Sequence, residues 1–226
     1  ADGHSHLLAS TNPGVVASDH YKEDFLRYEQ RLGIPDVNFS SMLPGLWLPS
    51  FLHDKLGYRT RAMVSMPVLN PATVVNRGFD DYRLMGRHND LAGMLDDLTF
   101  ENDQPTFYLL NAGETHYPYA LPDEAPSRWP RVSGLHGVLK RMKPGADGED
   151  EVADLDFDEL RERQIEAVRY VDTLAGRLFD TVPDNTWVIV TSDHGELFGE
   201  AGYFGHGPIM HEKVFEVPYV EGRVPR

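Results

Sequence analysis

Acidic and imidazole side chains follow an apolar run near the end of the sequence. Residues 186–192 (TWVIVTS) are mostly β-branched and apolar, and they lead directly into Asp193 and His194. Adjacent Asp and His at a strand exit can direct a carboxylate oxygen and an imidazole nitrogen at one cation, and Gly195 allows the backbone to turn away sharply. This segment therefore predicts a metal site, and His206 follows it after a Gly-rich turn.

A second predicted strand also ends near a histidine. Residues 105–111 (PTFYLLN) form an aromatic and aliphatic run that is typical of a buried parallel strand, and His116 follows shortly after it. In open α/β sheets, functional groups collect just past the carboxyl ends of the strands. We therefore expect His116 to share one crevice with Asp193, His194 and His206.

Strand and helix patterns alternate along the chain. Helices are expected at residues 46–56, 88–98 and from Asp156 to just before Pro183, and strands at 58–66, 105–111, 186–192 and 214–220. This alternation indicates an α/β domain with a mainly parallel sheet. Trp187, inside a predicted strand, is expected in the core.

The helix that begins at Asp156 has the clearest pattern. Asp156 and Glu159 resemble a capping box at its start. Its apolar residues recur at spacings of three to five and form one stripe, made of Leu160, Ile165, Val168, Val171, Leu174 and Leu178.

Composition narrows the classes of function. A chain of 226 residues is long enough for one sizeable domain, and we expect a single domain over 1–226. No apolar stretch approaches the roughly 20 residues of a membrane span and no secretory signal is visible, so a cytoplasmic location is expected. The net charge of −15 argues against nucleic-acid binding. Because the chain has no cysteine, every metal ligand must be nitrogen or oxygen.

Residues 120–155 are rich in Pro, Gly and acidic residues. Such blocks of like charge repel one another and stay solvated, so this segment is predicted to be a surface loop inserted in the domain. A calcium-binding loop is the alternative, but the acidic residues lack the Gly and the terminal Glu at the spacing that such a loop requires.

The run VIVTSDHGELFGEAGYFGHG (188–207) resembles the metal-binding signature of the alkaline phosphatase and sulfatase superfamily. The similarity extends over roughly residues 40–220, through GYRT, RGFDDY, THYPY and RYVDTLAGRLFD at 57–60, 77–82, 115–119 and 169–180. The resemblance implies an alkaline-phosphatase-like fold, in which a mainly parallel sheet is sandwiched by helices.

The same resemblance implies roles for four residues. Asp193 and His194 would be ligands of a divalent cation, which is Zn, Mn, Mg or Ca. His206 would contact a second metal or the substrate phosphate, and His116 would hold a sulfate or phosphate oxygen. A cation and imidazoles are the fixed positive groups that an acidic protein needs to bind an anionic ester.

The first strand of the superfamily domain has no counterpart in residues 1–45. Members open with an apolar strand that ends in acidic metal ligands, and the nucleophile follows. The segment GHSHLLASTNPG (3–14) resembles the region of the nucleophile, which would place the nucleophile position near Asp2. Ser5, Ser10 and Thr11 are the alternative candidate nucleophiles, although such residues are more often helix caps. We expect the domain to be incomplete at its N-terminus, with the first ligand and the nucleophile upstream of Ala1.

The pattern Cys/Ser-x-Pro-x-Arg, which classical sulfatases need for formylglycine, is missing. Its nearest match is Ser65-Met66-Pro67, where Leu69 stands in place of the arginine. This favours a hydroxyl nucleophile and a phosphohydrolase or phosphotransferase.

The resulting hypothesis is a metal-dependent hydrolase or transferase that acts on a phosphate or sulfate ester or on a phosphodiester. Its partner would be a small anionic ester. The alternative is a catalytically silent module of the same fold that binds a metal or an anion.

Overall fold

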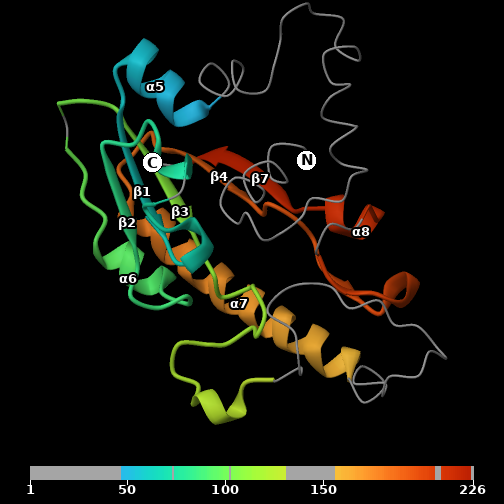
Figure 1. Cartoon of the computed structure of the whole chain (residues 1–226). Coiled ribbons are helices and arrows are strands. Elements are labelled where there is room, and N and C mark those ends of the chain that lie inside the picture. The colour runs from blue at the N-terminus through green and yellow to red at the C-terminus, as the bar shows by residue number, and fades with distance from the viewer. Residues whose placement is uncertain (1–46, 73, 102, 131–155, 207–209, 225–226) are drawn as a thin grey trace, which may run out of the picture. The chain divides into compact units, whose positions relative to one another are not determined.

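The computed structural model describes residues 47–72, 74–101, 103–130, 156–206 and 210–224. Contacts divide the chain into two compact units, whose elements are labelled in Figure 1. The first unit contains the described residues up to His88 and the segment Asp96–Ala112, and the second contains Asn89–Leu95 and the described residues from Gly113 onward.

The first unit is built on a parallel sheet with the strand order β2, β1, β3, and Figure 1 shows β1 between its two neighbours. β1 (Arg59–Val64) pairs with β2 (Asp81–Leu84) and with β3 (Thr106–Asn111). The strands predicted at 58–66 and 105–111 are confirmed, and so is the α/β class. β3 is half-buried rather than fully buried, because it is the last strand in this order.

Helix α5 (Leu48–Leu56) precedes the sheet and contacts β1. It begins with Pro49 in its first turn and ends at Gly57, whose φ of 69° is the left-handed conformation that glycine adopts without a steric penalty. The helix predicted at 46–56 is therefore confirmed.

The connection from β1 to β2 is joined to β1 by polar contacts. It contains two short 3₁₀ helices, η1 (Pro67–Leu69) and η2 (Val74–Asn76). The Asp80 carboxylate then accepts hydrogen bonds from the Thr60 backbone N–H at 2.7 Å and from the Thr60 hydroxyl at 3.1 Å. Burial opposes ionisation of Asp80, but these bonds outweigh it and lower the pKa of the carboxyl.

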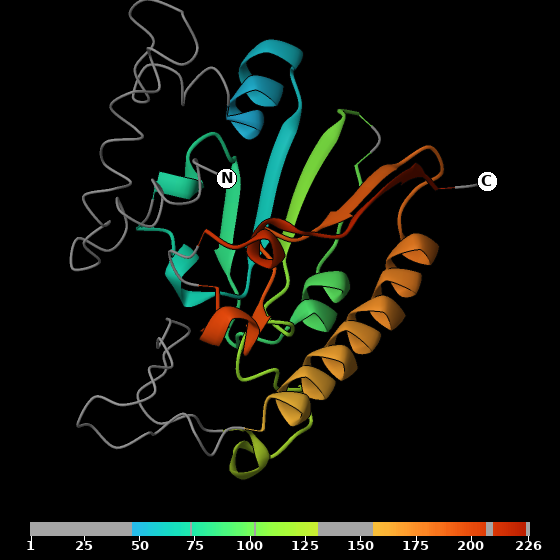
Figure 2. The same ribbon diagram turned by 90° about the vertical axis from the view of Figure 1, so that its right-hand side faces the viewer.

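The second unit combines one long helix with short strands (Figure 2). Its helical elements are α6 (Leu91–Asp96, in this unit up to Leu95), η3 (Pro126–Arg128), α7 (Phe157–Thr181), η4 (Glu200–Gly202) and α8 (Glu212–Phe215). Its strands are β4 (Trp187–Thr191), β5 (Leu197–Phe198), β6 (Phe204–Gly205) and β7 (Tyr219–Arg223). Among the described residues, no helix is both long and apolar enough to cross a membrane.

Helix α7 begins as predicted but buries a narrower stripe. The Asp156 side chain accepts a hydrogen bond from the Glu159 backbone N–H at 2.9 Å, which caps the helix. The buried residues are Leu160, Ala167 and Leu174, spaced by two helical turns. The spacing predicts Val168 in the buried stripe, but this residue is 52% exposed. The neighbouring Ala167 is buried instead.

The last two predicted strands differ from expectation in their surroundings. β4 is confirmed, but it pairs antiparallel with β7 rather than in a parallel arrangement. Trp187 is 61% exposed, so its assignment to the core was wrong. The strand predicted at 214–220 is also corrected, since α8 occupies its first residues and β7 begins only after Pro218, which has no N–H to donate.

A buried carboxyl joins α6 to the segment that follows β3. Glu114 is fully buried, and its Oε1 accepts a hydrogen bond from the Leu91 backbone N–H at 2.8 Å. Its Oε2 has no hydrogen-bond partner among the described residues. Burial therefore raises the pKa of Glu114, and the nearby Asp90 raises it further.

We predict that Glu114→Gln makes stability less dependent on pH. The folded state binds the Glu114 proton more tightly than the unfolded state, so the wild-type protein loses stability as pH rises from the ordinary value of 4.5 through the raised pKa. Glutamine keeps the acceptor for Leu91 and does not titrate. In urea unfolding at a series of pH values, the free energy of unfolding of the variant minus that of the wild type should increase with pH.

The matched control is Glu124→Gln, for which the difference in the free energy of unfolding should change with pH in the opposite direction. The pKa of Glu124 is lowered by hydrogen bonds from Arg163, so the wild-type protein loses the stabilisation of this pair as pH falls. Equal pH slopes for the two variants would contradict the assignment of Glu114.

Candidate metal centre

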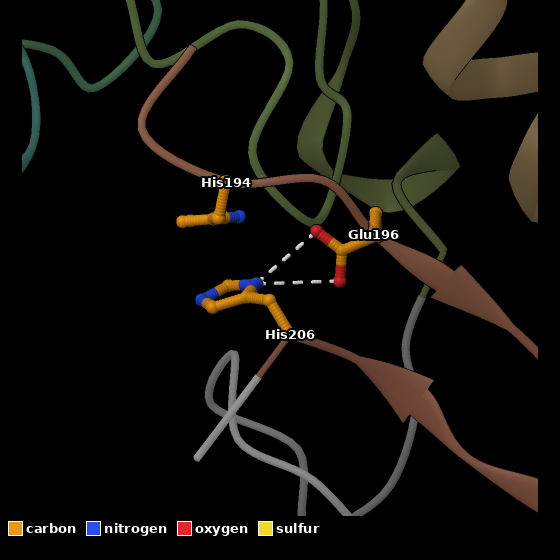
Figure 3. A group of neighbouring side chains, drawn as sticks. All are labelled: His194, Glu196 and His206. Carbon is orange, nitrogen blue, oxygen red and sulfur yellow. Dashed lines mark hydrogen bonds and ion pairs between the residues drawn. The ribbon is translucent and has the colours of Figure 1, made fainter. Parts of the chain in front are cut away.

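Strand pairing brings a carboxyl and an imidazole together at the open end of a hairpin. β5 and β6 pair antiparallel, with Leu197 opposite Gly205. The next positions outward are Glu196 and His206, which therefore lie opposite each other. The His206 Nδ1 is 3.2 Å from Glu196 Oε2 and 3.4 Å from Oε1 (Figure 3).

Three histidines gather around this hairpin end. The His194 and His206 rings are stacked, with centroids 3.7 Å apart and an interplanar angle of 21° (Figure 3). The His116 ring meets His206 edge-on, with centroids 5.6 Å apart. The structure thus brings together three of the residues that the sequence placed in one crevice.

Each of these rings has its Nδ1 next to an oxygen acceptor. The acceptors are the Tyr117 carbonyl for His116, at 2.7 Å, and the Gly195 carbonyl for His194, at 2.9 Å. A carbonyl can only accept, so in the neutral form of either ring the hydrogen belongs on Nδ1 and the lone pair on Nε2. The Glu196 carboxyl group likewise favours hydrogen on Nδ1 of His206.

Asp193 lies at the exposed side of this group. Its Oδ1 is 3.6 Å from the His194 Nε2, and its side chain is 60% exposed, against 18% for His194. Two atoms that each bind one zinc ion at about 2.1 Å in tetrahedral geometry lie about 3.4 Å apart. The separation of these two atoms is therefore compatible with joint coordination of one cation.

Glu196 is the residue that the sequence reasoning did not assign. Its side chain is only 6% exposed, and within the described part of the chain His194, Glu196 and His206 each offer a potential ligand atom within 4.8 Å of one another. Its position opposite His206 follows from the register of two strands that are each two residues long. Such short strands leave no alternating pattern in the sequence.

Burial controls the charge of His116. It lowers the pKa of this imidazole, and the neighbouring His206 and His194 lower it further, whereas the Tyr117 carbonyl and Glu196 act in the opposite direction. The neutral form of His116 is favoured, and this form presents an acceptor at Nε2.

Helix α7 supports the hairpin and the segment of His116 from one side. Leu160 and Ala167 form a buried cluster with Phe198 and Phe204 of the hairpin and with Tyr119. Polar contacts extend this packing on both sides.

Arg161 of α7 lies over the Phe198 ring, at 5.5 Å from its centroid, and its Nη2 is 3.3 Å from Glu200 of the hairpin. Arg163, two residues further along the same helix, makes two hydrogen bonds to Glu124, at 3.0 Å and 2.8 Å. The same helix thus contacts the hairpin that carries His206 and the segment that follows His116.

Gly195 is required because α8 approaches its backbone closely, rather than because the chain turns sharply there. Its N–H donates to the Val214 carbonyl of α8 at 2.8 Å. A Cβ at this position would lie 1.9 Å from the Lys213 carbonyl oxygen and 2.8 Å from that of Glu216. α8 therefore packs directly on the backbone between His194 and Glu196.

The candidate nucleophiles lie outside the described residues. Ser5, Ser10 and Thr11 belong to the segment that the structure does not describe, so their assignment as nucleophiles stays a prediction. His211 caps α8, where its Nδ1 accepts a hydrogen bond from the Lys213 backbone N–H at 3.1 Å.

A parallel α/β sheet, together with an Asp-His pair that leaves a strand beside two further histidines, defines the class as the alkaline phosphatase and sulfatase superfamily. The model of the Sulfatase family matches residues 48–220, which is more than half of the chain. The chain belongs to the sulfatase family.

One curated relative illustrates how local the detectable similarity is. The uncharacterized sulfatase YidJ of Escherichia coli (strain K12) is 34% identical over 55 residues, which are 23% of this chain and 11% of that protein. The chain thus matches only about a tenth of the length of that relative. No solved structure matches it.

We predict that Gly195→Ala separates α8 from the site. Because the added methyl group would overlap two backbone carbonyls, the variant should lose more than about 2 kcal/mol of unfolding free energy, measured in urea. Gly176→Ala in α7 is the control, since a Cβ there meets nothing within 4 Å, and it should gain up to about 1 kcal/mol. An unchanged stability of Gly195→Ala would contradict the close packing.

Proposed function

We propose that the chain carries the metal-binding part of a hydrolase that cleaves a sulfate or phosphate ester. The observation that carries the proposal is the 3.6 Å separation of Asp193 Oδ1 and His194 Nε2, two atoms that can bind the same cation. Membership in the sulfatase family supports an anionic ester as the substrate.

Asp193 and His194 would hold the cation, with His206 next to them. The donor set mixes imidazole nitrogen and carboxylate oxygen, which suits zinc or manganese better than calcium or magnesium. When bound, such a cation withdraws charge from the oxygens of the ester group. The orientation of the His194 ring fits this role, because its Nδ1 faces a carbonyl and its Nε2 faces Asp193.

His116 is suited to accept a proton in this reaction. Its neutral ring donates through Nδ1 to the Tyr117 carbonyl, so its Nε2 can accept the proton of an attacking hydroxyl group or water. Contact with an anionic oxygen, the role that the family resemblance implies, would require the protonated ring. Burial of the ring therefore favours the role of a base over that of an anion contact.

We predict that Asp193→Asn lowers the metal content. Asparagine has nearly the same size but no charge, and the exposed position of the side chain leaves the fold intact. After dialysis against zinc or manganese, the variant should retain less metal per chain than the wild type, measured by elemental analysis. Its affinity for the metal, measured by titration, should fall at least tenfold. Asp172→Asn on the exposed side of α7 is the matched control and should bind like the wild type.

Turnover is measured on an aryl sulfate, an aryl phosphate and a phosphodiester with each metal added in turn. Cleavage that is lost in both Asp193→Asn and His116→Ala would support the proposal. Unchanged metal binding in Asp193→Asn would remove the proposed ligand, and binding without turnover under every condition would favour the silent metal-binding or anion-binding module instead.

A further inference from the structure

We propose that Glu196 is a positioning residue, which fixes the tautomer and the orientation of His206 rather than binding the cation itself. This inference deepens the proposed function and rests on it for its role in catalysis. The arrangement of the two side chains, however, involves only residues of this chain and can be tested without added metal.

The hairpin register carries the first part of the argument. Leu197 pairs with Gly205 and Phe198 with Phe204, so the β5–β6 ladder directs Glu196 toward His206 at its open end. Both carboxyl oxygens lie within 3.4 Å of the same ring atom, Nδ1. Figure 3 shows the carboxyl group at the edge of the His206 ring, with both contacts on that one nitrogen.

Burial carries the second part. The Glu196 side chain is 6% exposed, and that of His206 is 18% exposed, so water competes little for this contact. A buried carboxylate is stabilised by an N–H donor, and the His206 ring is the donor that the hairpin supplies. In the neutral form of the ring, the N–H therefore belongs on Nδ1 of His206, which leaves the lone pair on Nε2 for a cation or a proton.

The stacked neighbour explains why such an acceptor is needed. His206 lies almost parallel to His194, and a stacked imidazole can rotate by half a turn about its χ2 bond without losing ring contact. That rotation would exchange a nitrogen for a carbon at the reactive edge. A carboxyl group on Nδ1 selects one of the two orientations.

A direct role of Glu196 as a ligand is disfavoured by the same contacts. A cation between Glu196 and the Nδ1 atoms of His194 and His206 would need lone pairs on both nitrogens. The His194 Nδ1 already faces the Gly195 carbonyl at 2.9 Å, which only an N–H can satisfy. Coordination of one cation through Glu196 and these two Nδ1 atoms is therefore disfavoured by their hydrogen-bond partners.

The test is long-range ¹H–¹⁵N NMR of the metal-free protein, which distinguishes a protonated ring nitrogen from one with a lone pair. The His206 signals are assigned by their loss in His206→Gln. The wild type should show hydrogen on Nδ1 and a lone pair on Nε2. In Glu196→Ala the population should shift toward hydrogen on Nε2, and an unchanged Nδ1–H tautomer in this variant would overturn the proposal.

Two further variants distinguish the loss of the Glu196 contact from a general loss of structure. Glu196→Gln keeps the size and one acceptor oxygen, and it should retain part of the Nδ1–H population that Glu196→Ala loses. Glu162→Gln on the exposed side of α7 should leave the His206 spectrum unchanged. If Glu196→Ala fails to fold, the spectra of Glu196→Gln and the wild type decide the question, because identical populations in the two would overturn the proposal.

Metal titration of the same proteins separates a positioning role from a ligand role. Asp193→Asn should remove the metal, whereas Glu196→Gln should weaken it by about 10-fold to 100-fold, as second-sphere substitutions do. Complete loss in Glu196→Gln together with an unchanged His206 tautomer would make Glu196 a ligand. Absence of metal in the wild type would contradict the proposed function, but the NMR result would stand by itself.

Discussion

The packing of one helix against one short hairpin supports the whole candidate site. Leu160 and Ala167 of α7 lie against Phe198 and Phe204, and Tyr119 completes this cluster from the segment that follows His116. Two strands of two residues each have too few backbone hydrogen bonds to be stable alone. Their register therefore depends on the apolar contacts with α7, and with it the positions of Glu196 and His206.

Three oxygen acceptors orient the imidazole rings of the site. The carbonyls of Tyr117 and Gly195 and the carboxyl of Glu196 each face an imidazole Nδ1. These contacts favour hydrogen on Nδ1 in the neutral form of each ring, which leaves the lone pair on Nε2. The two carbonyls belong to the residue that follows each histidine, whereas Glu196 reaches its histidine across the hairpin.

Membership in the sulfatase family agrees with this arrangement. A fold family does not specify the reaction, which has to be argued from the residues of the site. In the proposed function, the Asp-His pair would hold the cation and the buried His116 would accept a proton beside it. α8 completes the site by packing on the Gly195 backbone, a contact that only a residue without a side chain permits. The loop between β4 and β5 is thus held by its own backbone as well as by its side chains.

The sequence by itself determined the local elements and the identity of three histidines and one aspartate. Apolar runs predicted β1, β3 and β4, the Asp156 cap marked the start of α7, and the DHG segment indicated a metal site, because each of these signals lies within a few neighbouring residues. Only the tertiary structure decided that β4 pairs with β7, that Trp187 is exposed, and that Glu196 faces His206. These features depend on which segments meet in space, and cross-strand register and burial leave no trace in the spacing of residues along one short strand.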